Sequence, residues 1–223
     1  MLVKDMGTGV RMKLLVVSDL HASEKAVEYI SSWTAKVKPD ALIVCGDLTH
    51  FGPPIYALRF LASIKVKSFA VPGNCDTPHV IDIIDKSKTV LLHRRKVEWN
   101  GETLTGLGGG LETTNERPFE LSEDEVFKSL EANMPATIIV THVPAKGKND
   151  DAGGGEHLGS EGLLRIIERY KPRLALAGHV HQSRGIIMDD GLGTVFVNPG
   201  PAKDGYAAKV DIDGKDVEAE LLG

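Results

Sequence analysis

The sequence is poor in the features that mark secreted and membrane proteins. Its 223 residues include only two cysteines, Cys45 and Cys75, and a chain of this size in a reducing compartment has little need of a disulfide bond. No apolar run reaches the length that a membrane-spanning helix needs, and residues 1–11 lack the apolar core of a signal peptide. We therefore expect a cytoplasmic protein with two free thiols and no membrane contact.

An excess of basic charge is also absent. The chain has 26 Lys and Arg residues against 31 Asp and Glu residues, so we expect no binding of extended nucleic acid, although metal ions could still hold a nucleic-acid substrate. Apolar residues make up 42% of the chain, enough for a sizeable core. We expect one domain over residues 12–223 after an N-terminal extension at residues 1–11. The oligomeric state stays open, a homo-oligomer included.

The first half of the chain alternates apolar strands with helices, which is typical of βαβ units in a parallel sheet. Ser23 is placed to cap the first of these helices. Short strands then follow, two of them joined by the hairpin signal Asn100-Gly101. The expected strands are residues 13–18, 41–45, 68–71, 89–92, 96–99 and 102–107, and the expected helices are residues 23–37, 53–64 and 78–84.

The second half resumes this alternation and ends in β structure. Ser122 and Glu125 have the spacing of a capping box at the start of a helix. Residues 143–159 hold three consecutive glycines and no apolar period, so we expect a long loop, and such loops are more often functional than idle. We expect helices at residues 121–130 and 160–170, strands at 137–141 and 174–177, and at 183–222 an antiparallel meander that closes a second sheet.

Side chains that can bind metal ions follow five of the apolar runs. One such residue alone is more often a turn, cap or packing residue. Their coincidence at five strand ends points instead to one site, because open α/β sheets place their chemistry at the carboxyl ends of their strands. The candidate ligands are Asp19, His21, Asp47, Asn74, His142, His179 and His181.

The donor types in this group indicate which metals it would bind. Carboxylate, imidazole and amide oxygen donors without thiolate suit Mn, Fe or Zn ions rather than a structural zinc site. Seven donors are too many for one tetrahedral ion, but they suit two ions that share a bridging carboxylate. Two ions about 3.5–4 Å apart are the standard means of in-line displacement at phosphorus.

The same residues carry a family resemblance. In order and spacing they resemble the five signature blocks of the calcineurin-like metallophosphoesterases, and residues 157–160 are most similar to the small prokaryotic phosphodiesterase branch. The resemblance implies an α/β fold in which two mixed β-sheets pack face to face with helices on the outer faces. The blocks are Asp19-x-His21, Gly46-Asp47, Gly73-Asn74-x-Asp76, His142 and Gly178-His179-x-His181.

The resemblance also implies a ligand set and a mechanism. Two divalent ions would be bound, with manganese preferred and Fe, Ni or Zn as alternatives. A hydroxide shared by the ions would attack phosphorus while both metals neutralise charge on the phosphoryl oxygens. Asp19, His21, Asp47 and His181 would hold one ion, and Asp47, Asn74, His142 and His179 the other, with Asp47 as the bridge.

Position 75 departs from the family pattern, because many members carry there a histidine that can protonate the leaving oxygen. A thiol with a pKa near about 8.5 is a poorer acid, so Cys75 is either a small, partly buried residue or a substrate contact.

Asp76 is expected to orient a ligand imidazole. His157, in the long loop, is either a contact to the leaving group or phosphate or a solvated histidine. If His157 contacts the substrate, the catalytic candidates are Asp47, Asn74 and His157.

Three functions fit these observations. The first is hydrolysis of phosphodiesters in a small phosphate-ester substrate. A diester with a good leaving group has the least need of an acid, so it tolerates Cys75 in place of a histidine best. The second is a phosphomonoesterase or nucleotide pyrophosphohydrolase with the same site, mildly disfavoured because no Arg or Lys cluster stands beside the motifs. The third is a protein-binding scaffold with a decayed metal site, although all seven ligand positions hold competent residues. His50 could face the cleft, whereas His79 and His93 are expected in surface or packing positions.

Overall fold

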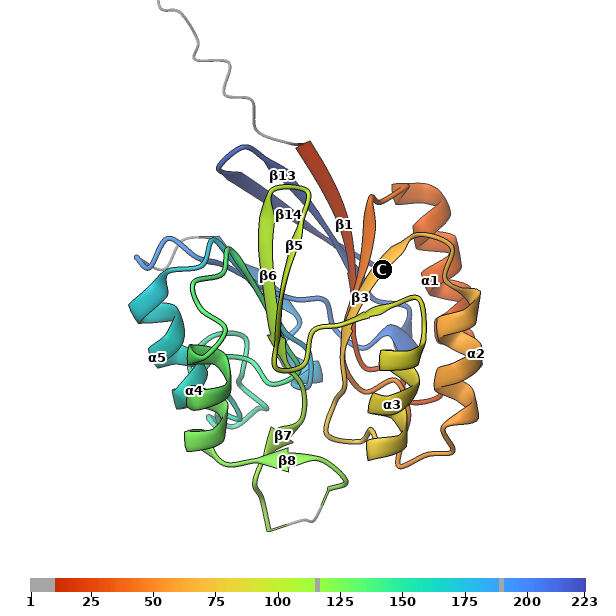
Figure 1. Ribbon diagram of the computed structural model, residues 1–223, viewed down its shortest axis with the longest axis horizontal. Helices are drawn as coiled ribbons and strands as arrows, with labels where there is room; N and C mark the ends of the chain where they lie inside the picture. Colours follow the sequence, from red (N-terminus) through yellow and green to blue (C-terminus); the bar gives the residue numbers. More distant parts are fainter. Residues whose placement is uncertain (1–10, 115–116, 189–190) are drawn as a thin grey trace, which may run out of the picture.

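The computed structural model describes residues 11–114, 117–188 and 191–223, which form two six-stranded β-sheets packed face to face (Figure 1). Helices cover both outer faces, so the layers run helix, sheet, sheet, helix. This architecture confirms the expected α/β fold of two mixed sheets. A small parallel pair, β7 (Gly110–Leu111) and β8 (Glu120–Leu121), lies at one end of the sandwich.

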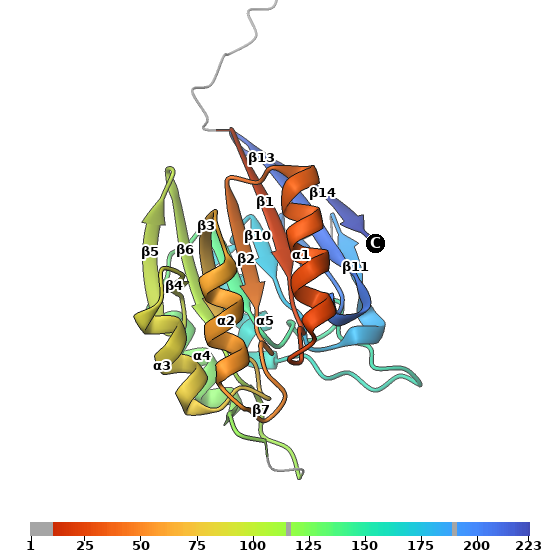
Figure 2. The ribbon, with the colours of Figure 1, turned by 90° about the vertical axis from the view of Figure 1, so that its right-hand side faces the viewer.

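The first sheet has the strand order β14-β13-β1-β2-β3-β4. Its strands β1 to β4 are parallel because a helix connects β1 to β2, β2 to β3 and β3 to β4, and these three helices cover the outer face (Figure 2). The strands are β1 (Arg11–Val17), β2 (Ala41–Cys45), β3 (Lys67–Val71), β4 (Val90–Leu91), β13 (Ala207–Asp213) and β14 (Asp216–Leu222), and the helices are α1 (Glu24–Val37), α2 (Ile55–Ser63) and α3 (Pro78–Lys86).

The second sheet has the order β11-β12-β10-β9-β6-β5 and carries two helices on its outer face. Its central strands are parallel, whereas the edge strands β5 and β11 are antiparallel to their neighbours. The elements are β5 (Arg95–Trp99), β6 (Glu102–Leu107), α4 (Glu123–Glu131), β9 (Ile138–Thr141), α5 (Glu161–Tyr170), β10 (Leu174–Leu176), β11 (Gly185–Ile187) and β12 (Val195–Asn198), with short 3-10 turns η1 (His181–Ser183) and η2 (Ala202–Asp204).

Local sequence signals set the helix starts. The Ser23 hydroxyl accepts a hydrogen bond from the Ala26 N–H at the start of α1, and Ser122 and Glu125 form the predicted capping box of α4. Ser160 caps α5 in the same way as Ser23 caps α1. None of the helices in the described ranges is long and apolar enough to cross a membrane.

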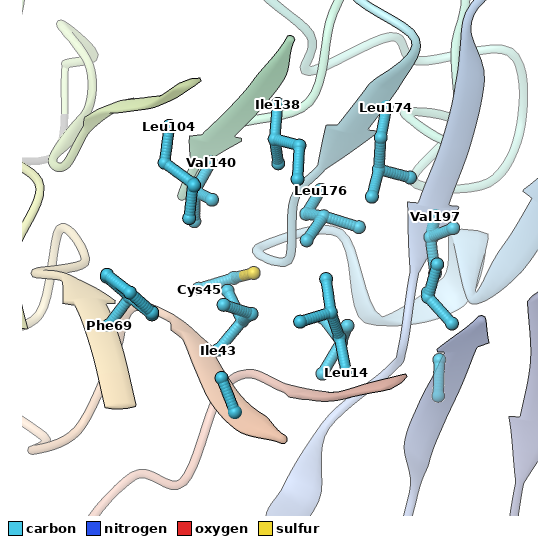
Figure 3. Close-up of a cluster of buried hydrophobic side chains, with 14 of the residues drawn as sticks. Leu14, Ile43, Cys45, Phe69, Leu104, Ile138, Val140, Leu174, Leu176 and Val197 are labelled. Carbon is cyan, nitrogen blue, oxygen red and sulfur yellow. The ribbon is translucent and has the colours of Figure 1, made fainter. Parts of the chain in front are cut away.

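The largest apolar core lies between the two sheets (Figure 3). Side chains from β1, β2 and β3 meet side chains from β6, β9, β10 and β12, and further clusters fill the space between each sheet and its helices. Burial of this kind contributes about 25 cal/mol per Å² of apolar surface, so the sandwich is a rigid base for the loops at its ends. The labelled residues are Leu14, Ile43, Cys45, Phe69, Leu104, Ile138, Val140, Leu174, Leu176 and Val197.

The prediction for residues 183–222 is wrong in its sheet assignment. These residues do not form one antiparallel meander, because β12 pairs parallel to β10 in the second sheet while the β13–β14 hairpin extends the first sheet beside β1. Alternating apolar residues such as Val210 and Ile212 indicate a half-buried strand, but both sheets offer an apolar inner face to such a strand. At the other terminus, β1 begins at Arg11, and residues 1–10 of the expected extension lie outside the described ranges.

Candidate metal centre

Five strand ends meet at one edge of the sandwich, as the sequence predicts. Asp19 and His21 follow β1, Asp47 follows β2, and Asn74 follows β3 in the first sheet. The second sheet supplies the remaining three candidates, His142 after β9 and then His179 and His181 after β10. Both sheets therefore contribute to the same group of polar side chains.

The loops that carry these residues have unusual backbone conformations. Four of the candidate ligands have positive φ angles: Asp19 (55°), His21 (46°), Asp47 (51°) and His179 (68°). Positive φ angles are uncommon for residues other than glycine. They occur mainly at functional sites, where contacts with the surrounding structure stabilise the strained backbone. Hydrogen bonds between the loops stabilise these conformations. The His21 N–H donates to the Asp47 carbonyl (3.0 Å), and the His179 N–H donates to Asp19 Oδ2 (3.0 Å).

Two glycines of the motifs allow the loops to approach closely. A Cβ atom at Gly73 would overlap the Asp47 carboxylate, and one at Gly178 would overlap the Ser18 side chain next to Asp19. Glycine is therefore required at both positions for packing and not for a positive φ angle.

One group of candidate ligands surrounds Asp19. His181 Nε2 lies 3.2 Å and His21 Nε2 lies 3.7 Å from Asp19 Oδ1, and the two nitrogens are 3.4 Å apart. Within the described residues, Asp19 Oδ1 is nevertheless a buried oxygen that accepts no hydrogen bond. A buried polar atom without a hydrogen-bond partner is costly, and a divalent cation at this place would be a partner for the oxygen. The imidazole nitrogens beside the oxygen are suitable further ligands for such a cation.

A second group surrounds His142, which is fully buried. Its Nε2 lies 2.9 Å from Asn74 Oδ1, 3.2 Å from His179 Nδ1 and 3.5 Å from Asp47 Oδ1. Burial lowers the pKa of His179 to about 4, so this imidazole is neutral and can act as a metal ligand at neutral pH. The donor chemistry of both groups therefore fits divalent metal ions.

Asp76 supports the centre in a different way from that expected. It contacts no ligand imidazole in the described structure; instead Oδ1 accepts hydrogen bonds from the N–H and hydroxyl of Thr49 (2.8 Å each), and Oδ2 accepts from the N–H groups of Leu48 (3.1 Å) and Gly73 (2.8 Å). Burial, together with the nearby Asp47 carboxylate, raises the pKa of Asp76 to about 6. The expectation was wrong because the two loops after β2 and β3 turn their backbone N–H groups, and not a histidine, toward this carboxylate.

A cavity of about 490 Å³ opens beside the candidate ligands. Arg117 and Lys203 line it, although the sequence shows no basic cluster beside the motifs. They were missed because Arg117 lies between β7 and β8 and Lys203 lies in η2, two segments that only the tertiary structure brings here. The backbone of η2 contacts the β1 loop directly, since the Lys203 N–H donates to the Asp19 carbonyl (3.4 Å).

Cys75 and His50 also line this cavity. Both cysteines are free thiols, as predicted, and Cys75 is only 5% exposed. The Cys75 N–H donates to Asp47 Oδ1 (2.8 Å), and burial raises the pKa of its thiol above the usual range. His50 faces the cleft as expected, and its Nδ1 lies 3.3 Å from Nδ1 of His21.

The other three histidines lie at the surface, in a packed position and beside a second cavity. His79 is exposed, whereas His93 accepts a hydrogen bond from the Gly108 N–H (3.0 Å) and packs against Phe119, and burial lowers its pKa to about 4. Both positions agree with the prediction. His157 lines an adjoining cavity of about 320 Å³ that also contains Asn74 and His179.

Known proteins match this chain over most of its length. The sequence profile of the family described as calcineurin-like phosphoesterase matches residues 12–183. An uncharacterised protein of Methanocaldococcus jannaschii is 33% identical over 202 residues, which cover 85% of this chain and 88% of that protein. A protein of Vesicomyosocius okutanii named "Probable cyclic nucleotide phosphodiesterase" is 27% identical over 192 residues, covering 76% of this chain and 78% of that protein.

Solved structures share the fold. The crystal structure of a Thermus thermophilus protein has a TM-score of 0.72 at 17% identity and covers 95% of this chain and 99% of that one. The family match spans most of the chain and includes every candidate ligand from Asp19 to His181. The chain therefore belongs to the calcineurin-like phosphoesterase family and is a metal-dependent phosphoesterase.

Proposed function

We propose that the protein hydrolyses phosphodiesters with two divalent metal ions. The observation that carries this proposal is the position of Asp47 between the two groups of histidines. Its Oδ2 lies 3.7 Å from His21 Nε2, and its Oδ1 lies 3.5 Å from His142 Nε2. A carboxylate in this position suits a bridge between two ions.

The donors divide into two sets around this bridge. We expect manganese, with Fe, Ni or Zn as alternatives, because the donors are oxygen and imidazole nitrogen. When bound, the ions would lower the pKa of water and neutralise charge on the phosphoryl oxygens. Asp19, His21, Asp47 and His181 would hold one ion, and Asp47, Asn74, His142 and His179 the other.

The chain's own side chains bind the ester and supply the proton. Arg117 and Lys203 place positive charge beside the phosphate. During hydrolysis a water molecule loses one proton to solvent and its oxygen joins phosphorus, the bond from phosphorus to the leaving alcohol oxygen breaks, and that oxygen keeps the electron pair. His157 gives that oxygen a proton, a task for which Cys75 is unsuited because burial raises the pKa of its thiol.

The name of one relative favours diesters over monoesters, because the protein from Vesicomyosocius okutanii is named "Probable cyclic nucleotide phosphodiesterase". Hydrolysis of monoesters or nucleotide pyrophosphates is the second candidate, and Arg117 and Lys203 favour it because two cations suit a more highly charged phosphate.

Metal analysis combined with a substrate panel tests the proposal. The purified protein is assayed on diester, monoester and pyrophosphate substrates with Mn, Ni, Fe, Zn or Mg. We expect about two ions per chain and the highest kcat/KM on a diester. Asp47→Asn should lose both hydrolysis and one or more bound ions, whereas Asp82→Asn, an exposed control on α3, should retain them. A metal-free, inert protein that binds another protein would instead support the scaffold function.

A further inference from the structure

The metal cavity and the second cavity meet at a shared wall. Asn74, Arg117 and His179 line both of them. A phosphate bound at this wall therefore has an open space on each side, and each space can take one of the two ester groups of a diester.

The two spaces differ in charge. Lys203 and several histidines line the metal cavity beside the Asp47 carboxylate. Away from the shared wall, the second cavity has two carboxylates, Glu112 and Glu120, beside His157 and the apolar side chains of Leu111 and Leu158. A negatively charged group would be attracted to the first space and repelled by the carboxylates of the second.

His157 is held in a fixed orientation on the wall of the second cavity. Its Nδ1 lies 2.9 Å from Oδ1 of Asp150, a carboxylate that is only 2% exposed. Asp150 is itself fixed, because its Oδ2 accepts hydrogen bonds from the N–H groups of Gly147 (2.9 Å) and Gly159 (3.2 Å). With Nδ1 engaged by Asp150, Nε2 is the ring nitrogen that can meet a bound group.

We propose, building on the proposed diester hydrolysis, that the second cavity binds the leaving alcohol and selects one that is uncharged and carries hydroxyl groups. The cavity volume of about 320 Å³ suits a small polyol or a single sugar unit. As the water oxygen joins phosphorus, the bond between phosphorus and this alcohol breaks, the electron pair stays on the alcohol oxygen, and Nε2 of His157 provides the proton, which it regains from solvent. An ester group that carries a second phosphate is retained on the side of Lys203.

The identity of the products tests this assignment. In glycerophosphoglycerol with one terminal phosphate, the diester can be cleaved on either side of its phosphorus. Release of glycerol leaves glycerol bisphosphate, whereas release of glycerol phosphate leaves a second glycerol phosphate. We expect glycerol and glycerol bisphosphate to exceed the alternative products at least about tenfold, since repulsion of about 1.4 kcal/mol already gives that ratio.

A charge reversal gives the matched comparison. Glu112→Lys should shift the product ratio toward glycerol phosphate, whereas Glu168→Lys, the same charge change at an exposed position on α5, should leave it unchanged. Equal amounts of both product sets from the unmodified protein, or the same ratio in Glu112→Lys, would overturn the subsite while leaving diester hydrolysis intact. Failure to cleave unphosphorylated glycerophosphoglycerol and every other diester would overturn both proposals.

Discussion

Asp76 holds the metal centre together without reaching the cavity. It is fully buried and accepts hydrogen bonds from the loops that carry Asp47 and Asn74. Asp47 in turn accepts the Cys75 N–H, so the β2 and β3 loops are joined twice. The positions of two candidate ligands therefore depend on a carboxylate that binds only backbone and a threonine hydroxyl.

Replacement of Asp76 by alanine should be strongly destabilising. Three N–H groups and the Thr49 hydroxyl would lose their acceptor in a buried place, so we expect the free energy of unfolding to fall by about 3 kcal/mol or more. Urea denaturation in the presence of EDTA measures this loss apart from metal binding. Asp76→Asn, which keeps one acceptor oxygen, should lose less, and a loss in Asp76→Ala no larger than in the exposed control Asp82→Ala would contradict the assignment.

Asp150 should tune the pH dependence of turnover through His157. The contact with the Asp150 carboxylate raises the pKa of His157 above its usual 6.5. A proton donor works only while protonated, so kcat should fall as pH rises through this pKa. Asp150→Asn removes the negative charge and lowers the pKa, so the falling limb should move to lower pH.

The pH profiles of kcat for the unmodified protein, Asp150→Asn and His157→Gln check this role. His157→Gln should lose the falling limb together with most of the rate on poor leaving groups, and its effect should be smallest on a nitrophenyl ester. A falling limb at the same pH in Asp150→Asn would show that Asp150 does not position the proton donor.

Sequence and structure differ in how well they reveal single residues. The candidate ligands could be predicted because each lies within five residues of the end of an apolar strand, and parallel strands end at a common edge. Arg117, Lys203 and Asp150 could not, because they lie in segments without regular periodicity whose paths depend on tertiary packing. The expectation that Asp76 orients a ligand imidazole was wrong for a related reason. Asp76 binds backbone N–H groups, and no residue pattern in the sequence indicates such partners.

At the level of elements, α4 and α5 are connected by a cap that crosses between them. Glu123 in the first turn of α4 accepts hydrogen bonds from the Ser160 hydroxyl (2.6 Å) and from the N–H groups of Glu161 (2.9 Å) and Gly162 (2.8 Å) at the start of α5. This contact fixes the end of the loop that carries Asp150 and His157. Capping by a residue 37 to 39 positions away has no local sequence signal.

Glu123→Ala should therefore destabilise the protein by about 2 kcal/mol, because α5 loses an acceptor for two N–H groups and a favourable charge at its N-terminus. Asp124→Ala removes the neighbouring carboxylate with its exposed i,i+4 pair to Lys128 and one acidic group from the first turn of α4, so it should cost no more than about 1 kcal/mol. Urea denaturation of both variants measures the difference. Equal losses would mean that the crossing cap contributes nothing beyond ordinary surface charge.

For the C-terminal strands, the sequence predicts the strands themselves but not the sheet to which they belong. The βαβ units follow local periodicity and the caps of α1 and α4 follow local capping residues, so the sequence predicts both closely. The sheet to which β13 and β14 belong depends on which inner face they cover. Ala208, Val210 and Ile212 would be equally apolar against either sheet, so the choice requires the three-dimensional arrangement.

On the scale of the whole molecule, the candidate ligands join the two sheets. The carboxylates and Asn74 follow strands of the first sheet together with His21, whereas His142, His179 and His181 follow strands of the second. Ions bound between them would connect the two halves of the sandwich at the end that its apolar core does not reach. Metal binding should therefore be coupled to the stability of the entire fold.

This coupling predicts a metal-dependent melting temperature. One ion at about 100 times its dissociation constant adds about 2.7 kcal/mol to the free energy of unfolding, which corresponds to roughly 5–10 °C in a chain of this length. Calorimetry after EDTA treatment and after addition of manganese measures the shift. Asp47→Asn should lose most of it, because its carboxylate faces both groups of histidines, whereas Asp82→Asn should keep it. A shift of the same size in both variants would place the stabilising ion elsewhere on the molecule, and the bridging role of Asp47 would have to be abandoned.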